Sequence, residues 1–507
     1  MNIIEYEKLC KSCDVILKSE ASTAVTKAIP WLHVLNPHPT TQERYRGLWD
    51  RNQKNEYLSL FRSIWRFIRN IFVSSPIPKY ISSHPNIRQT DLLIMSHLVS
   101  KSHIGVDQDF YFGDMGSELK SNNISAQILL TNHTRENPKK IISSWGDKEL
   151  PRLMLPNRLF LISELLILFR LAKEAISLYK ASILEADKTL SDIYKMSAQA
   201  AISFESISAL RFLQQFEQLI SLVKPKAILV TMEGHAFERL AFHAARKINP
   251  RIKCFGYQHA ILFPHQHAVK RALGDNYDPD IIFTAGNQTI STLEKSYEGH
   301  NVKVLNIGTH RCSCPETIFD LEKSKFDSIC LVLPDGNISE CLELCQFAYS
   351  AAVNIPEIEF MIRLHPLNSI EMLVSKNIIF KNLPKNLVFS NSKDIQNDFK
   401  LSKWALYRGS GSAIHAVMAG CRPIYVSSFE SINIDPLHEV TSGRKRVKSL
   451  NELKIILISD SLLTNKSFYE ELQDLFFYCK QYFTPANTNV LLNHLEIDCG
   501  VKDGIDL

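Results

Sequence analysis

The chain has 507 residues, of which 45% are hydrophobic and 22% are charged, and 58 Lys+Arg stand against 53 Asp+Glu. One hydrophobic core rarely serves so long a chain, so we expect about two to four domains. The composition excludes disordered, collagen-like and disulfide-scaffold proteins. A net charge of +5 falls far short of the dense basic field typical of nucleic-acid binding.

The cysteines and the most apolar segment bear on the compartment. The odd count of 11 cysteines, their irregular spacing and the lack of a signal peptide predict reduced thiols in a cytoplasmic protein. A redox pair at Cys312 and Cys314 is the alternative. The most apolar run, residues 159–172, contains Glu164 and Arg170 and is too short to span a membrane, so we expect a buried helix there.

The first 85 residues are irregular. Helices are expected near residues 3–18 and 53–72, and a Pro/Ser-rich linker or loop follows them. We therefore predict a helical N-terminal appendage over residues 1–85, in which we recognise no chemistry.

Short apolar runs then alternate with segments of helical periodicity. This alternation indicates βαβ units and a parallel sheet, and predicts one α/β domain over residues 86–310. The expected strands are 91–97, 126–131, 226–231, 253–257, 280–284 and 302–307, and the expected helices are 113–120, 158–182, 185–221 and 236–247.

A second α/β domain is expected over residues 327–465, after a linker at 311–326. Its expected strands are 328–333, 359–363, 387–389, 404–407 and 423–426, and its helices 339–353 and 413–419. The last segment, 466–507, should begin with a long helix over 466–482 that could pack back across the domain junction. Two Rossmann-like domains facing each other place a cleft between the carboxyl ends of their strands, where such folds bind ligands.

The first domain offers an acidic candidate and a histidine candidate for this cleft. Glu233 follows the strand at 226–231 and is placed as a general base or nucleophile, although helix capping would also explain it. Glu238, one turn further, is interpreted as a supporting residue or as half of an ion pair with Arg239. His259 ends the next strand and should line the cleft, with His265 as a weaker candidate. No carboxylate or thiolate cluster completes a metal site.

The second domain offers three candidate segments for binding an anion. Arg363, His365 and Pro366 end a strand, so that a cationic fork and an imidazole lie at the sheet edge. Ser410, Gly411 and Ser412 lead into a helix, where backbone N–H groups and hydroxyls can receive an anion, although a tight turn would also explain them. Asp335 and Gly336 follow the first strand; turn chemistry alone accounts for them, yet their position allows donor contact.

These motifs, in the order in which they occur along the chain, make it resemble bacterial surface-carbohydrate glycosyltransferases of GT-B fold. It is similar in particular to the Kdo transferases and sialyltransferases of capsule and lipopolysaccharide assembly, which use CMP-activated acidic sugars. Glu233-Gly234 matches their acidic motif, His365-Pro366 their His-Pro motif, and Ser410-Gly411-Ser412 their serine motif. Two departures are the Gly between the serines and the reading Glu-Gly-His where the family has two acids and Gly. The resemblance covers roughly residues 90–430.

The resemblance implies a role for each motif. Glu233 would be the catalytic carboxylate, His365 would contact the nucleotide phosphate, and Ser410 and Ser412 would hold phosphate or the sugar carboxylate. It implies a nucleotide-sugar donor and no cofactor, a glycan or lipid-linked glycan acceptor, and other assembly enzymes as partners. Peripheral membrane contact at the inner face could use the basic run at 443–448, although a solvated charged loop accounts for this run better. A CDP-glycerol-type phosphotransferase, a sugar-nucleotide 2-epimerase and a non-catalytic scaffold are the alternatives.

Overall fold

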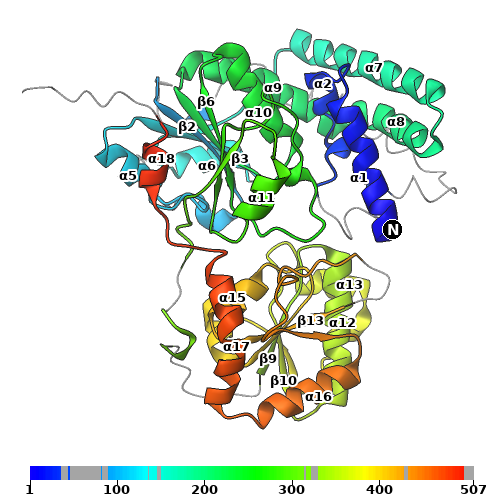
Figure 1. The fold of residues 1–507 in the computed structure, drawn as a ribbon, viewed down its shortest axis with the longest axis vertical. Coiled ribbons are helices and arrows are strands. Elements are labelled where there is room, and N and C mark those ends of the chain that lie inside the picture. Colours follow the sequence, from blue (N-terminus) through cyan, green and yellow to red (C-terminus); the bar gives the residue numbers. More distant parts are fainter. Residues whose placement is uncertain are drawn as a thin grey trace, which may run out of the picture.

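The computed structural model describes residues 1–35, 44–45, 65, 81–82, 89–134, 136–145, 150–312, 316–320, 329–427 and 432–495. The expected helix at 53–72 lies outside these residues except for Trp65, as do Cys314, much of the expected linker and the end of the C-terminal tail. Two α/β units lie one above the other along the long axis of the molecule (Figure 1). This confirms the predicted fold class, with two Rossmann-like domains.

The first sheet has the strand order β1-β4-β3-β2-β5-β6-β7-β8, and every pair is parallel except β1 with β4. Taken from β2, this is the doubly wound order 3-2-1-4-5-6 extended by one strand, so its topological switch point lies between β2 and β5. The strands are β1 Ile81–Ser82, β2 Leu92–Leu98, β3 Ala126–Asn132, β4 Arg152–Met154, β5 Ala227–Thr231, β6 Lys253–Gln258, β7 Ile281–Thr284 and β8 Lys303–Asn306.

The second sheet has the order β11-β10-β9-β12-β13-β14 and is parallel throughout, which is again 3-2-1-4-5-6. Its switch point lies between β9 and β12. The strands are β9 Ile329–Leu333, β10 Glu359–Ile362, β11 Leu387–Phe389, β12 Trp404–Tyr407, β13 Arg422–Val426 and β14 Lys445–Val447. All four residues of β12 are buried, as expected of a central strand covered on both faces.

Helices cover the sheets and connect successive strands. In the first domain they are α1 Ile3–Lys18, α2 Ala24–Lys27, α5 Met115–Ser121, α6 Pro138–Ser143, α7 Leu161–Leu184, α8 Lys188–Ala201, α9 Phe204–Val223, α10 Ala236–Ile248 and α11 Ile290–Ser296. In the second they are α12 Ile338–Asn354, α13 Ile370–Lys376, α14 Ile395–Leu401, α15 Ser412–Met418, α16 Leu450–Ser461 and α17 Asn465–Lys480, while α18 Thr488–Leu492 returns to the first domain (Figure 1).

Two helix predictions are wrong. The expected helix at 185–221 is split into α8 and α9, because Ser203 caps α9 by accepting a hydrogen bond from the Ser206 N–H. The run at 159–172 does lie largely in α7, but that helix is not buried. Phe169 is 69% exposed, whereas Ile167 and Leu171 face the core.

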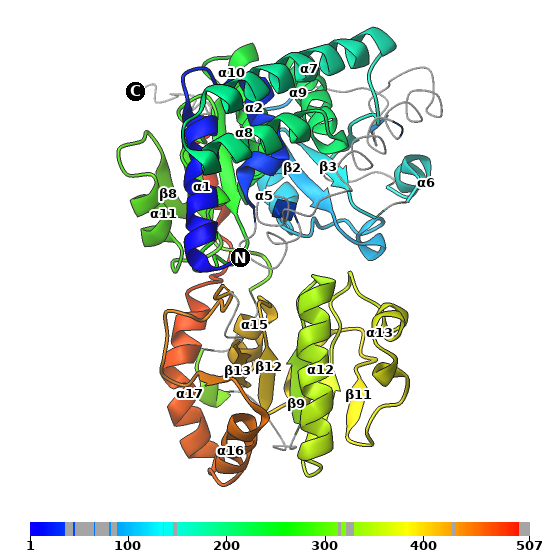
Figure 2. The same ribbon diagram turned by 90° about the vertical axis from the view of Figure 1, so that its right-hand side faces the viewer.

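The N-terminal helix α1 docks on the first domain, alongside α8 (Figure 2). The Tyr6 hydroxyl donates to the His265 carbonyl at 2.7 Å, and the Asp14 carboxylate accepts from His267 and Arg271. Burial raises the pKa of Asp14, but the hydrogen bond from His267 and the charge of Arg271 outweigh it and bring this pKa down to about 2. Residues of the predicted appendage are thus held by charged contacts to the segment that follows β6.

The chain crosses between the domains twice, and the two crossings are bonded to each other. The Thr309 N–H donates to the Thr484 carbonyl at 2.8 Å, and the Thr484 N–H donates to the Ala285 carbonyl at 3.0 Å. Gly308 has φ +74°, and a Cβ there would come within 2.1 Å of the Pro485 carbonyl oxygen. The end of the first domain therefore packs directly against the segment that returns from α17.

Candidate functional site

The turn between β5 and α10 presents Glu233 at the carboxyl end of the first sheet, beside the switch point. Gly234 has φ +92°, and a Cβ there would lie 2.3 Å from the Ala268 carbonyl carbon, so only glycine fits. The buried Glu238 carboxylate accepts the N–H groups of Glu233, Gly234 and His235 at 2.9, 2.7 and 2.8 Å. Helix capping is thus performed by Glu238, which leaves the Glu233 side chain available.

Glu238 does not form the ion pair considered from the sequence. The Arg239 guanidinium instead pairs with Asp278 and donates to the Arg271 carbonyl at 2.8 Å. Burial and the neighbouring Glu233 raise the pKa of Glu238 to about 8, against the three backbone N–H groups that lower it. Glu238 therefore holds the shape of the turn that carries Glu233.

The Glu233 carboxylate lies between two imidazoles and is 36% exposed. Its Oε1 is 3.4 Å from His259 Nε2, and its Oε2 is 3.9 Å from His235 Nε2. Desolvation by the surrounding protein raises the pKa of Glu233, while the charge of Arg311 lowers it. A carboxylate whose pKa is raised, and which solvent can reach, is a stronger proton acceptor than an ordinary glutamate.

Histidines from four strand ends lie at this edge of the sheet, and two of them, His235 and His259, flank the Glu233 carboxylate. His97 Nδ1 is 3.0 Å from His133 Nε2, and His97 Nε2 is 2.9 Å from the Thr231 hydroxyl oxygen. Burial lowers the pKa of His97 to about 3 and of His235 to about 4, and lowers that of His259 well below its usual value. These imidazoles are therefore neutral at pH 7, and the two that flank Glu233, His235 and His259, add no positive charge beside it.

Sequence reasoning missed His97 and His133. Their signal was present, because His97 lies in β2 and His133 follows β3, on the other side of the switch point from Glu233. The carboxyl ends of adjacent parallel strands meet at one sheet edge, so these positions could have been grouped with His259.

Arg311 supplies the positive charge at this edge and was also missed, because it fell in the expected linker. Its guanidinium donates to the His259 carbonyl at 3.3 Å and lies 5.1 Å from the Phe110 ring and 5.5 Å from the Tyr111 ring. Within the described part of the chain, its buried Nε has no hydrogen-bond partner. Burial is the main cause that lowers the pKa of His415 in the second domain, and the charge of Arg311 lowers it further. The charge of Arg311 therefore acts at the junction of the two domains.

The loops after β9 and β10 lie together at the edge of the second sheet. A Cβ on Gly336 would lie 3.0 Å from His365 Nδ1, and the Asn368 side-chain amide donates to the carbonyls of Asp335 and Gly336 at 3.1 and 3.3 Å. His365 and Pro366 are exposed. Burial raises the pKa of Asp335 to about 6, against the Asn337 N–H that lowers it.

The loop after β12 completes this edge and faces the first domain. Gly409 has φ +67°, and a Cβ there would lie 3.8 Å from Asp335 Oδ2; one on Gly411 would come within 2.7 Å of Ile261 Cδ1, in the segment after β6. Among the described residues, the Ser410 and Ser412 hydroxyls make no hydrogen bond. The structure thus brings the serine motif next to the Asp335 loop and against the segment that follows His259.

The Arg363 guanidinium is engaged within the second domain, unlike the available cationic fork expected from the sequence. The Arg363 Nη1 donates to Asp398 Oδ2 at 2.9 Å and to the Ser392 carbonyl at 2.6 Å, so its guanidinium anchors the loop after β11. These contacts engage the Arg363 fork within the protein, so Arg363 has no part in the proposed site. Burial lowers the pKa of the other candidate, His265, while the charge of Glu7 raises it.

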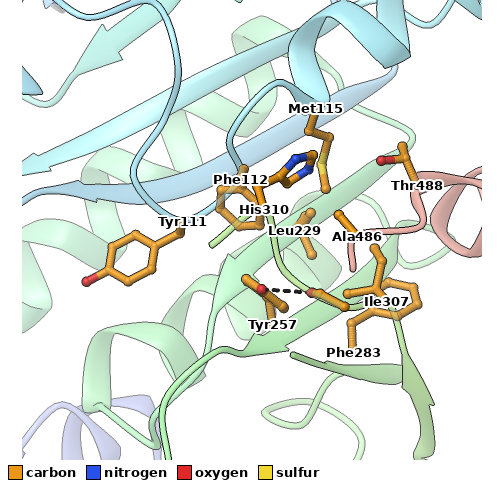
Figure 3. Close-up of a pocket in the computed structure, with 11 residues that line it drawn as sticks. Tyr111, Phe112, Met115, Leu229, Tyr257, Phe283, Ile307, His310, Ala486 and Thr488 are labelled. Atoms are coloured by element: carbon orange, nitrogen blue, oxygen red, sulfur yellow. Dashed lines mark hydrogen bonds between the residues drawn. The ribbon is translucent and has the colours of Figure 1, made fainter. Parts of the chain in front are cut away.

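An apolar pocket lies in the first domain beside this edge (Figure 3). The Tyr257 hydroxyl donates to the Gly308 carbonyl at 3.0 Å, while the Tyr111 ring points away from the other lining side chains (Figure 3). The Tyr111 ring instead lies 4.2 Å from that of His259. The lining residues are Tyr111, Phe112, Met115, Leu229, Tyr257, Phe283, Ile307, Gly308, His310, Ala486 and Thr488. With so apolar a lining, this pocket does not suit a phosphate.

The described residues contain no group of three or more His, Cys, Asp or Glu side chains arranged to hold a metal ion. Among them there is also no helix long and apolar enough to cross a membrane.

No family model matches the chain, and no curated protein matches it. Among solved structures, MnaA from S. aureus in complex with UDP is 13% identical, with 80% of this chain and 96% of that chain covered and a TM-score of 0.45. The UDP-GlcNAc 2-epimerase from Neisseria meningitidis bound to UDP-GlcNAc is 12% identical, with 79% and 99% covered and a TM-score of 0.44. The glycotransferase of kitacinnamycin is 11% identical, with 81% and 100% covered and a TM-score of 0.43. These are likenesses of fold alone.

Proposed function

We propose that the chain is a nucleotide-sugar-dependent glycosyltransferase of bacterial surface polysaccharide synthesis. It transfers an acidic sugar, such as Kdo or a sialic acid, from a CMP donor to a glycan acceptor. One observation carries the proposal: Glu233 lies at the switch point of one sheet, and the loops of Asp335 and Ser410 lie at the switch point of the other. The contact of Gly411 with Ile261 brings these two edges together.

In this proposal Glu233 acts as the general base. The acceptor hydroxyl gives its proton to the Glu233 carboxylate while its oxygen bonds to the anomeric carbon, and the bond from that carbon to the donor phosphate breaks, leaving the electron pair on CMP. Desolvation raises the pKa of Glu233, which strengthens its carboxylate as an acceptor of the hydroxyl proton. Neutral His259 Nε2 lies 3.4 Å from Glu233 Oε1 and borders the carboxylate without a countercharge.

The leaving phosphate is assigned to the second domain. His365 is exposed at the sheet edge, and the Ser410 and Ser412 hydroxyls, together with the backbone of residues 335–336 and 410–412, can donate hydrogen bonds to phosphate oxygens. Arg311, whose buried Nε has no partner within the described residues, adds a donor and a positive charge beside Glu233. This charge suits a donor sugar that carries its own carboxylate, and CMP as carrier follows from the motif resemblance.

A panel of CMP-, CDP-, UDP- and GDP-linked donors tests the proposal. Binding is measured by calorimetry, and each donor is then incubated with and without a glycan acceptor. We expect preferential binding of the CMP-sugar and a product only when the acceptor is present. Conversion of a UDP-sugar to its isomer without acceptor would identify a 2-epimerase, and transfer from CDP-glycerol would identify a phosphotransferase. Failure to bind any donor, with capture of assembly enzymes, would identify a scaffold.

A further inference from the structure

Helix α7 presents an apolar face to solvent that extends along its whole length. Ile162, Phe169 and Ile183 are 74%, 69% and 66% exposed. Positions three, four and seven residues apart share one side of a helix, so these exposed side chains lie on the same side of α7. We call this the α7 face; its members are Phe160, Leu161, Ile162, Leu165, Leu166, Phe169, Ile176, Tyr179, Ile183 and Leu184. Apolar exposure of this extent on one helix marks an interaction surface.

The exposed charges on α7 all have one sign. Arg170, Lys173 and Lys180 are exposed, whereas the two acidic side chains of the helix are engaged inward. Glu164 accepts two hydrogen bonds from Arg211, at 2.6 and 3.0 Å, and Glu174 accepts from Thr26 at 2.6 Å. The exposed charges beside the α7 face are therefore all cationic.

The α7 face takes no part in the junction between the two domains. Both views place α7 at the end of the molecule away from the second domain (Figures 1 and 2). The other side of α7 packs through Ile167, Leu171 and Leu178 onto the first domain. The α7 face is thus rigidly presented, and no described helix is long and apolar enough to span a membrane.

We propose that the α7 face is a membrane-docking surface that lies flat in the interface of a lipid bilayer with anionic headgroups. The apolar side chains would enter the acyl boundary, and Arg170, Lys173 and Lys180 would reach the phosphates, their aliphatic stems lying along the apolar surface. A second copy of this chain is a poor occupant, because two such faces would bring lysines together with no exposed acidic side chain of α7 to pair with them.

The basic run at 443–448, which the sequence offered either as a candidate for such a contact or as a solvated charged loop, is engaged elsewhere. Arg444 pairs with Asp435, Lys445 Nζ is 3.9 Å from a Glu471 carboxylate oxygen, and the Arg446 guanidinium lies 5.8 Å from the Tyr425 ring. These contacts neutralise or cover the positive charges of the basic run, so the structure favours α7 as the site of membrane contact.

The proposal is tested by co-sedimentation of the full chain with two kinds of vesicle. One kind is phosphatidylcholine alone, and the other contains 30 mol% phosphatidylglycerol, a ~30% anionic fraction that is sufficient to test charge attraction. We expect binding to the anionic vesicles. The variant Leu165→Ser/Phe169→Ser should lose about tenfold or more in partition coefficient, because it removes two deeply inserted side chains. The variant Lys173→Gln/Lys180→Gln should lose about fivefold per lysine on anionic vesicles only.

The matched control is Ile455→Ser/Leu462→Ser, which removes two side chains that are 67% and 83% exposed on the second domain. It should leave vesicle binding unchanged, and thermal melting confirms that each variant folds. Absence of wild-type binding to the anionic vesicles would overturn the proposal, and so would equal binding by Leu165→Ser/Phe169→Ser. Sedimentation of the wild type as a dimer that this variant dissociates would also overturn it, by showing that a second copy covers the face. No readout depends on sugar transfer, so the result is independent of the proposed activity.

Discussion

Replacing Glu233 by glutamine should remove transfer while leaving the fold intact. The amide has nearly the shape of the carboxylate but cannot accept the proton of the acceptor hydroxyl. General-base catalysis contributes about 10² to 10⁴ in rate, so we expect at least a hundredfold loss, or about 2.7 kcal/mol of transition-state stabilisation. The side chain is 36% exposed and its nearest described ionisable neighbours are neutral imidazoles at 3.4 and 3.9 Å, so the free energy of unfolding should change by less than about 0.5 kcal/mol.

The pH profile gives this prediction a second readout. A general base works when deprotonated, so the rate falls as the pH drops through the pKa of the base. Because desolvation raises the pKa of Glu233 above its ordinary 4.5, the acid limb of kcat/KM should lie above that value. In Glu233→Gln this limb should disappear. The assay is product formation from a CMP-sugar and a glycan acceptor, followed from about pH 4 to pH 9.

Glu238→Gln is the matched control, because it makes the same chemical change five residues away. Glu238 accepts three backbone N–H groups, and an amide must turn its own N–H groups toward some of those donors. We expect this variant to lose about 1 to 3 kcal/mol of stability, seen as a lower melting temperature. Turnover of Glu233→Gln within about threefold of wild type, with the acid limb retained, would refute the assignment of Glu233 as the base.

Three further predictions concern the second domain, the docking of α1 and the junction. His365→Ala should cut transfer at least about a hundredfold through loss of phosphate contact, with little change in melting temperature because the ring is exposed; normal CMP-sugar affinity by calorimetry would contradict it. Burial raises the pKa of Asp14, but the hydrogen bond from His267 and the charge of Arg271 outweigh it and lower this pKa from 3.8 to about 2. Ionised Asp14 therefore contributes about 2 kcal/mol to the free energy of unfolding above pH 4, and this contribution is lost as the pH falls toward 2. Denaturant unfolding should show that Asp14→Asn lacks this part of the acid loss. Gly308→Ala, at φ +74° and with a carbonyl oxygen 2.1 Å from the new Cβ, should destabilise by more than about 2 kcal/mol, which calorimetric melting would measure.

The sequence predicted the parallel strands well, because buried strands in α/β proteins are short apolar runs bounded by turns. The strand expected at 226–231 is β5 at Ala227–Thr231, all five residues of which are buried. The burial of α7 could not be predicted in the same way. Local apolarity does not say what lies outside a helix, and here the tertiary structure leaves the outer side of α7 to solvent.

For the candidate site, the sequence identified residues that directly follow strands and missed residues that reach the site from other segments. Glu233 and His259 follow β5 and β6 and could be placed by topology. Arg311 comes from the segment leaving the first domain, and only the fold shows that its guanidinium donates to the His259 carbonyl. Arg363 shows the converse limit. A cation at a strand end looks like a ligand group in sequence, but the partner that occupies it, Asp398, is 35 residues away.

The paired chain crossings have a consequence for how the two halves of the site meet. Because Thr309 is hydrogen-bonded to Thr484 and Gly308 lies against Pro485, the two connections are tied to each other where they meet the first domain. A rotation of the second domain would have to move both connections at this tie. In the proposed reaction, such a rotation would carry the Ser410 loop away from Glu233, so the tie would influence how readily a donor enters and the leaving nucleotide departs.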